Sequence, residues 1–409
     1  MIKNIAVCGP FSDINLGDYA MLINNLIDID FHQAYVFSYD EKFSTKLLND
    51  YFPDHEINVC PVEVDSIKIS KINSRSLPLH VISAITNYDE ILDALKSTKR
   101  LLVNGGGYFN SLWFKEHRRE RLCKIIAPII IASVNNIPIT FSGNGIGPFD
   151  DEDIPFFRSF FALLKNFTLS CRDDYLSPAW CNLLGVTPKS LITGPDDLFP
   201  INTKLLGKET TIPLPNAQYM VFETYYTIEY LNQNKTLFIN FFKYVRDELG
   251  LKIVLLPFHL GLGGVEQAKL LKSWFEEAYL VDIESSGFLP IANAFTVIEQ
   301  AKFLITSRYH GLVFSVQAKT PVLSVLRSVL GDKAYYFNKN YGFLEQSVGR
   351  RCSPNLFMYD DYVDIFELAT TGLLCDVLER QSSLFDEELE VNLKAAQKAR
   401  EQLLSNFIE

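Results

Sequence analysis

Short apolar runs alternate with longer segments of helical periodicity along most of the chain. The runs at 5–8, 100–103 and 252–256 are too short to be buried helices, and each precedes a segment with helical spacing. This alternation is typical of βαβ units, in which helices connect parallel strands and cover the faces of the sheet. The sequence therefore predicts an α/β fold built on parallel sheets.

The length of the chain and a break in its pattern indicate two such folds. A chain of 409 residues is too long for one ordinary core, and between 201 and 218 the periodicity gives way to Pro, Thr and Asn. We expect a Rossmann-like domain over 1–200, a linker over 201–218 and a second Rossmann-like domain over 219–345. These two doubly wound domains are expected to face each other across a cleft. Residues 346–409 predict a helical extension that packs on one of the domains.

Composition and charge narrow the class of ligand. Hydrophobic residues make up 48% of the chain and charged residues 21%, a balance typical of a folded globular protein. The net charge of −11 disfavours binding to the phosphate backbone of a nucleic acid. The sequence contains no stripe of Lys and Arg that would override this repulsion locally. We therefore expect no nucleic-acid partner, and binding of an anionic substrate would depend on individual arginines inside the cleft.

The cysteines and the apolar segments indicate a reducing compartment and no membrane span. The seven cysteines are scattered without a C-x-x-C pair or a Cys/His cluster of metal-site spacing, so no metal is expected. The run from Ile125 to Val134 is short for a bilayer and contains Pro128. The apolar run after Met1 is shorter than that of a signal peptide. We expect the chain in the cytoplasm, at most peripheral at the inner face of the membrane.

Three loops after predicted strands are rich in glycine and asparagine. Ligands of open parallel sheets bind beyond the carboxyl ends of the strands, and glycine lets the backbone approach a ligand closely. The loops match neither the G-x-G-x-x-G nor the G-x-x-x-x-G-K-[ST] pattern, which disfavours a Rossmann dehydrogenase or a P-loop enzyme. The first loop is equally compatible with a turn in which Asp18 caps a helix. The candidate substrate-binding residues in the loops are Asn15, Gly17, Asp18, Gly105, Gly106, Gly107, Asn144 and Gly145.

Two arginines and a histidine stand at the ends of predicted strands in different domains. Arg172 ends a strand of the first domain, and Ser307-Arg308-Tyr309-His310-Gly311 follows a strand of the second. An arginine fork binds carboxylate or phosphate oxygens, and an adjacent imidazole can donate a proton. The alternative for Arg172 is an ion pair with Asp173. His259 also follows a strand, either as a second cleft histidine or as a structural one.

In their order and spacing these motifs resemble the polysaccharide pyruvyl transferase family over about residues 1–330. The resemblance implies a GT-B-like pair of Rossmann-type domains, phosphoenolpyruvate as the donor and a surface-glycan sugar as the acceptor. It implies that the second domain is the donor side and the first the acceptor side, with Arg172, Arg308 and His310 lining the donor site. The motifs are Asn15-Leu-Gly-Asp18, Gly105-Gly-Gly107, Gly143 to Pro148, Arg172-Asp173 with Ser177, Pro195-Asp196, and Ser307-Arg-Tyr-His-Gly311 followed by Ala318-Lys-Thr-Pro321.

The predicted activity is therefore that of a ketal-pyruvyltransferase of capsule or exopolysaccharide synthesis. His310 is the expected acid, Arg308 and Arg172 hold the two anionic groups of phosphoenolpyruvate, and Tyr309, Gly311 and His259 complete the substrate-binding set. The acceptor is a sugar, expected on a lipid-linked oligosaccharide, and no cofactor is expected. Two alternatives stay open: a GT-B glycosyltransferase that uses a nucleotide sugar, for whose ribose Glu284 is a poor ligand, and a non-catalytic glycan-binding component.

Overall fold

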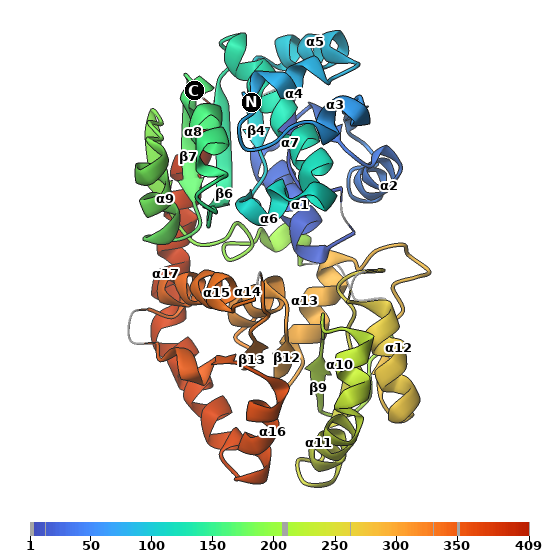
Figure 1. Ribbon diagram of the computed structural model, residues 1–409. Coiled ribbons are helices and arrows are strands. Elements are labelled where there is room, and N and C mark those ends of the chain that lie inside the picture. Colours follow the sequence, from blue (N-terminus) through green and yellow to red (C-terminus); the bar gives the residue numbers. More distant parts are fainter. Residues whose placement is uncertain are drawn as a thin grey trace. The chain divides into compact units, whose positions relative to one another are not determined.

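The computed structural model describes residues 4–12, 14–206, 212–261, 263–329, 331–349 and 352–408. These residues form two compact units, each built on its own parallel sheet (Figure 1). The N-terminal unit consists of Met1–Asp13, Asp18–Asp197 and Ala396–Glu409, and the C-terminal unit of Ile14–Gly17 and Leu198–Ala395. Helices alternate with the strands in both units, so the α/β fold predicted from the alternating pattern is confirmed.

The sheet of the N-terminal unit has the strand order β3-β2-β1-β4-β6-β7-β8, and β5 pairs with β6. All of these pairings are parallel. The order reverses between β1 and β4, so the loops that follow these two strands diverge and leave room for a ligand. The strands are β1 (Asn4–Cys8), β2 (Gln33–Ser38), β3 (Glu56–Pro61), β4 (Leu101–Val103), β5 (Gly106–Phe109), β6 (Ile139–Ile146), β7 (Phe167–Cys171) and β8 (Ser190–Thr193).

The helices of this unit cover an almost wholly apolar core. Most of the apolar run from Ile125 to Val134 is buried in α7, whereas Val134 itself is exposed. The rings of Phe109 and Phe160 stack in the same core. No helix in the described part of the chain combines the length and the apolarity that a bilayer span requires. The helices are α1 (Leu16–Ile29), α2 (Glu41–Tyr51), α3 (Ser66–Ser70), α4 (Leu79–Ser83), α5 (Tyr88–Thr98), α6 (Ser111–Phe114), α7 (Glu116–Val134), α8 (Ile154–Leu163) and α9 (Leu176–Leu184).

The C-terminal unit repeats this topology with the strand order β11-β10-β9-β12-β13-β14, again all parallel. Its order reverses between β9 and β12. The strands are β9 (Tyr219–Phe222), β10 (Lys252–Leu255), β11 (Tyr279–Leu280), β12 (Leu304–Thr306), β13 (Val322–Val325) and β14 (Met358–Tyr359). The helices are α10 (Ile228–Gln233), α11 (Lys235–Asp247), α12 (Val265–Trp274), α13 (Ile291–Glu299), α14 (Tyr309–Gln317), α15 (Ala334–Ser347) and α16 (Tyr362–Thr370), with 3-10 turns at Thr203–Leu205 and Pro354–Leu356.

The glycine loops of the N-terminal unit contain more regular structure than the sequence indicates. β6 continues through the second glycine segment to Ile146, and β5 begins at Gly106, inside the first. Gly106 pairs with Asn144 and Phe109 with Ile146, with an irregular register between these two pairs. The ladder satisfies backbone groups in these stretches, so part of each glycine segment is strand rather than loop.

The final helix, α17 (Leu374–Ile408), differs from the expected packing on a single domain. It begins in the C-terminal unit and ends in the N-terminal unit. In the C-terminal unit, the Gln381 side chain hydrogen-bonds both the N–H and the C=O of Val322 in β13. In the N-terminal unit, Arg100 donates a hydrogen bond to the carbonyl of Phe407. The expected helical extension, residues 346–409, also contains the strand β14. Of the expected linker, residues 207–211 lie outside the described residues.

Candidate functional site

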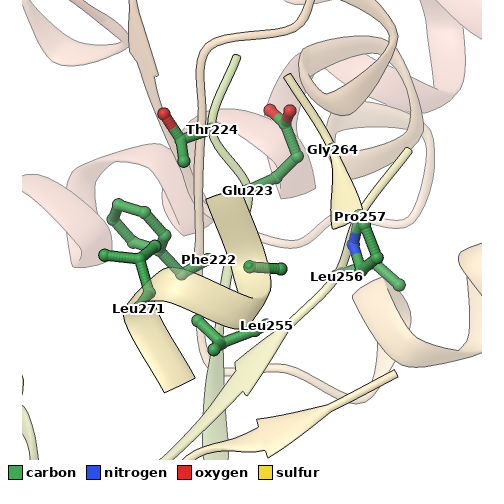
Figure 2. A pocket seen from close by; sticks show the side chains of 9 residues that line it. Phe222, Glu223, Thr224, Leu255, Leu256, Pro257, Gly264 and Leu271 are labelled. Atoms are coloured by element: carbon green, nitrogen blue, oxygen red, sulfur yellow. The ribbon is translucent and has the colours of Figure 1, made fainter. Parts of the chain in front are cut away.

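The switch point of the C-terminal unit gathers charged and aromatic side chains. Glu223, Thr224 and Tyr225 follow β9, and Ser307 and Arg308 follow β12, so the two loops meet where the strand order reverses. Ligands of doubly wound sheets bind at such points. A small pocket lies at this end of the sheet, and Figure 2 shows its walls, formed by the ends of β9 and β10 and the start of α12.

Arg308 is held by protein groups on three of its nitrogens. It is the N-cap residue of α14 and is 8% exposed. Its Nε donates to Glu223 Oε1 over 3.0 Å and its Nη2 to the carbonyl of Gly263 over 2.8 Å. Its Nη1 lies 3.4 Å from Asn15 Oδ1. Two residues predicted from distant loops, Asn15 and Arg308, are therefore in contact within one unit.

Glu223 is the acidic partner of this arginine and was not predicted from the sequence. Its Oε2 accepts hydrogen bonds from Thr306 Oγ1 (2.6 Å) and from the N–H of Ser307 (3.1 Å), so both of its oxygens are engaged. Burial raises the pKa of Glu223 and lowers the pKa of Arg308, against the attraction between the two charges. Removal of both charges from water is the cost of this arrangement, and the bond from Arg308 Nε to Glu223 fixes the orientation of the guanidinium.

His310 lies in the first turn of α14 and contacts the Asn15-Leu-Gly-Asp18 segment. It is 7% exposed, and a Cβ at Gly17 would lie 1.7 Å from its Nδ1, so the imidazole occupies the space that any other residue at 17 would fill. A Cβ at Gly311 would lie 2.3 Å from Thr306 Oγ1, so this glycine lets α14 start close against β12. The first turn of a helix also presents N–H groups that favour an anion.

His259 and Tyr309 lie in the same unit. Backbone groups of His259 and Asn15 form an isolated antiparallel bridge, and Leu16 donates its N–H to the carbonyl of Phe258 over 3.2 Å. His259 Nδ1 accepts a hydrogen bond from Gly261, which orients the ring on its own loop. The Tyr309 ring packs edge-on against the His310 ring with centroids 5.1 Å apart.

In the N-terminal unit, two of the predicted glycine segments pack on a buried carboxylate. A Cβ at Gly105 would lie 2.6 Å from Asp197 Oδ2, and a Cβ at Gly143 would lie 2.7 Å from Asp197 Oδ1. The sequence suggested close approach to a substrate as the reason for these glycines. The structure provides a second reason, because any side chain at either position would collide with Asp197.

Arg400 of α17 supplies the counter-charge for this carboxylate. Its Nη1 lies 3.2 Å from Asp197 Oδ1, its Nη2 donates to Asn25 Oδ1 over 2.9 Å, and its Nε pairs with Asp28. Ser142 donates its hydroxyl to Asp197 Oδ2 over 2.5 Å. Burial raises the pKa of Asp197 and the charge of Arg400 opposes this rise. The sequence carries no local signal for Arg400, which stands in an ordinary mixed-charge helix.

Arg172 pairs with Asp196 rather than with Asp173. Its Nη1 lies 3.4 Å from Asp196 Oδ2, and the side chain of Arg172 is 5% exposed. The carboxylate of Asp173 instead accepts hydrogen bonds from Ser177 at the start of α9. A Cβ at Gly145 would lie 3.0 Å from the Nε of Arg172, so Gly145 and Arg172 are in contact.

The remaining predicted residues of this unit surround the carboxyl ends of β1 and β4. Asn104 Nδ2 donates to the carbonyl of Asp18 over 3.3 Å, and Asn110 Nδ2 donates to that of Gly107 over 2.9 Å. Gly106 has φ +143° and lies against Pro10 and Tyr108. Asn144, fully buried, donates from Nδ2 to the carbonyl of Ser142 over 2.7 Å.

The predicted residues thus form two sets, one in each unit. Their joint action on one ligand, including that of Arg172 with Arg308, stays a prediction. The set of the C-terminal unit is Asn15, Gly17, His259, Arg308, Tyr309, His310 and Gly311, and that of the N-terminal unit is Asp18, Gly105, Gly106, Gly107, Asn144, Gly145 and Arg172.

The family model for polysaccharide pyruvyl transferase matches residues 15–328. The chain belongs to the polysaccharide pyruvyl transferase family. The matched region begins at Asn15 and contains Arg172, Arg308 and His310, and the resemblance predicted from the ordered motifs is confirmed. Membership indicates a transferase of polysaccharide biosynthesis. No curated protein matches the chain.

Solved structures with the same architecture are nucleotide-sugar enzymes of the GT-B fold. The UDP-GlcNAc 2-epimerase of Neisseria meningitidis bound to UDP-GlcNAc has a TM-score of 0.59 at 12% identity, covering 98% of this chain and 99% of that one. MnaA of S. aureus with UDP has a TM-score of 0.55 at 14% identity, covering 95% and 91%. HepE of Anabaena in complex with UDP and glucose has 0.54 at 10%, covering 99% and 100%. At these identities the likeness shows the fold alone, and the predicted GT-B-like class is confirmed.

Proposed function

We propose that this protein is a ketal-pyruvyltransferase that transfers the enolpyruvyl unit of phosphoenolpyruvate to a sugar of a surface polysaccharide or of its lipid-linked precursor. The observation that carries the proposal is that a buried arginine and a buried histidine, Arg308 and His310, stand two residues apart at the start of α14 in a member of this family. An oriented guanidinium suits the anionic groups of the donor, and an imidazole beside it suits proton transfer.

In the proposed reaction His310 donates a proton to the methylene carbon of phosphoenolpyruvate, which becomes a methyl group. The adjacent carbon becomes cationic, and a sugar hydroxyl attacks it, forms a C–O bond and loses its proton, which restores the imidazolium. The bond between this carbon and the phosphate oxygen then breaks, and phosphate leaves with the electron pair. A second hydroxyl closes the ketal and gives its proton to the departing phosphate.

The two predicted arginines have complementary tasks in this scheme. Arg308 and Arg172 hold the carboxylate and the phosphate, so that the charge on the leaving group is stabilised as it develops. The glycine segments that contain Gly105 and Gly145 would contact the acceptor sugar. The scheme consists of proton transfers and displacement of phosphate, so phosphoenolpyruvate supplies the activated group and no electron carrier takes part. We place this chemistry in the cytoplasm, where phosphoenolpyruvate is available.

A nucleotide-sugar glycosyltransferase is the nearest alternative, and the acidic residues of the C-terminal unit argue against it. Such an enzyme needs a carboxylate after a strand to bind ribose hydroxyls. Both oxygens of Glu223 are taken by Thr306, Ser307 and Arg308. Glu284 is exposed and paired with Lys269 at 2.6 Å. The ribose contact therefore has no suitable acid in either position.

Ligand-induced thermal stabilisation separates these two functions. At a concentration about 100 times its Kd, a ligand stabilises the folded state by about 2.7 kcal/mol, or roughly 5 to 10 °C in a unit of this size. We expect such a shift with phosphoenolpyruvate and none with UDP or UDP-GlcNAc. Release of inorganic phosphate upon addition of a lipid-linked oligosaccharide then tests the transfer itself. A shift with UDP-GlcNAc alone would favour the glycosyltransferase.

Gly17→Ala is expected to lower kcat about 100-fold, because the new methyl group must displace the His310 imidazole by about 1 Å or more. The matched control is Gly194→Ala, where the added Cβ would lie 3.5 Å from Ala399, at ordinary contact distance. The measurement is steady-state phosphate release for both variants. Wild-type kcat in Gly17→Ala would show that the position of this imidazole is irrelevant to turnover.

A further inference from the structure

A second arginine, Arg327, lies beside the site of the C-terminal unit and has no role so far. It follows β13, the strand next to β12, and its guanidinium carbon lies 3.4 Å from the centre of the Tyr225 ring. The guanidinium carbon of Arg308 lies 4.5 Å from the centre of the same ring. Two cations therefore share one aromatic ring at the switch point of this sheet.

The protein leaves most of the hydrogen-bond donors of Arg327 available to a ligand. A guanidinium has five N–H donors in one plane. Arg327 uses one nitrogen in a bond to the Tyr336 hydroxyl, with Nη1 and Oη 3.1 Å apart, and forms no ion pair among the described residues. Stacking on Tyr225 occupies a face of the guanidinium but not its N–H edge. An ion pair with a carboxylate would have covered that edge.

The position of Arg327 is set before any ligand arrives. The preceding residue, Leu326, donates its N–H to the carbonyl of Tyr359 over 2.8 Å, and its own carbonyl accepts the Tyr226 hydroxyl over 3.1 Å. The Tyr336 ring flanks the same guanidinium, 5.0 Å from ring centre to carbon. An arginine that is already ordered loses less side-chain entropy when it binds an anion.

The local charge favours a ligand with more than one negative charge. Arg308 and Arg327 are close enough that the charge of Arg327 helps to lower the pKa of Arg308, after the larger effect of burial. Glu223 is the carboxylate paired with Arg308 and leaves the second positive charge unbalanced. In a chain with a net charge of −11, this local excess of positive charge marks a place for an anion.

We propose that Arg327 binds the phosphate group of the donor, while Arg308 binds its carboxylate. The assignment rests on the proposed function for its donor. A phosphate group carries up to two charges on three terminal oxygens, so it suits the guanidinium with the larger number of available donors. Arg327 is also less buried than Arg308, which lowers the desolvation cost of the larger charge. The contact of Arg327 with the phosphate is made within the C-terminal unit and adds to the contact that the proposed scheme assigns to Arg172.

Isothermal titration of the full chain with four probes tests this assignment: phosphoenolpyruvate, inorganic phosphate, pyruvate and UDP. Arg327→Met is expected to weaken phosphoenolpyruvate and phosphate binding about 10- to 100-fold and to leave pyruvate binding within about twofold. Arg327→Lys is expected to fall between Met and wild type, because an ammonium keeps the charge but not the planar fork. The control is Arg246→Met on α11, a half-buried arginine paired with Asp247 and Glu277.

The outcomes separate failure of this assignment from failure of the proposed function. If Arg327→Met binds phosphoenolpyruvate with wild-type affinity, the assignment is overturned and the proposed function stays intact. The same holds if both variants, Arg327→Met and Arg327→Lys, bind it as tightly as the wild type does. If the wild type binds UDP but not phosphoenolpyruvate, and Arg327→Met weakens UDP binding, the phosphate contact stands while the proposed donor is wrong. If none of the phosphate-bearing probes binds the wild type, Arg327 is not a phosphate-binding residue. The Lys variant keeps the test valid should the Met variant fail to fold.

Discussion

His310→Gln is expected to lower the rate of ketal formation by about 10²- to 10⁴-fold, the usual contribution of a positioned general acid. Glutamine retains a polar side chain of similar reach but cannot deliver a proton to carbon. The affinity for phosphoenolpyruvate should change by only a few fold, because the charges that attract the donor are those of Arg308 and the other cations. Single-turnover phosphate release and isothermal titration measure the two effects separately.

The matched control is His117→Gln, an exposed histidine in α7. It should behave as the wild type in both measurements. A His310→Gln protein that forms the ketal at the wild-type rate would remove the acid from the proposed scheme. A variant that loses donor affinity and turnover in equal proportion would instead make His310 a binding residue.

Arg400→Met is expected to destabilise the N-terminal unit by about 3 to 5 kcal/mol, because it leaves Asp197 as a buried charge without its cation. This corresponds to a fall of about 6 to 20 °C in the unfolding midpoint of that unit. Loss of the pairing with Asp28 adds in the same direction. Thermal unfolding followed by circular dichroism measures the change.

The pH dependence of the Arg400→Met defect follows from the pKa of Asp197. Burial already raises this pKa, and Arg400 is the charge that opposes the rise, so the variant should have a still higher value. When the pKa of a carboxyl is higher in the folded than in the unfolded chain, the folded state loses stability as the pH rises through the folded pKa. The difference in midpoint between wild type and variant should therefore be larger at pH 8 than at pH 5.

A second substitution identifies the cause of the defect. Asp197→Asn removes the charge that Arg400 balances, so the double variant Arg400→Met with Asp197→Asn should recover much of the lost midpoint and show little pH dependence. A double variant as unstable as Arg400→Met alone would assign the loss to packing of α17 rather than to the uncompensated carboxylate. Since Asp197 lies against Gly105 and Gly143, Arg400→Met alone should also disturb both glycine segments.

The sequence was sufficient to predict which loops matter in the C-terminal unit. Arg308 and His310 follow a short apolar run and precede a helical pattern, and this local order places them at the carboxyl end of a strand whatever the neighbouring strands are. The contact between Gly17 and His310 was not predictable, although both residues were singled out, because nothing local records the partner of a glycine.

The amino-acid sequence alone determined the element order, the two-fold repetition of the parallel sheet and the family, because hydrophobic period and turn chemistry are properties of neighbouring residues. Only the tertiary structure decided that Glu223, Arg308 and Arg327 meet beside Tyr225, and that Arg400 neutralises a carboxylate 203 positions away in the chain. These contacts depend on strand order and on where the last helix ends, and a buried charge finds its partner through space rather than along the sequence.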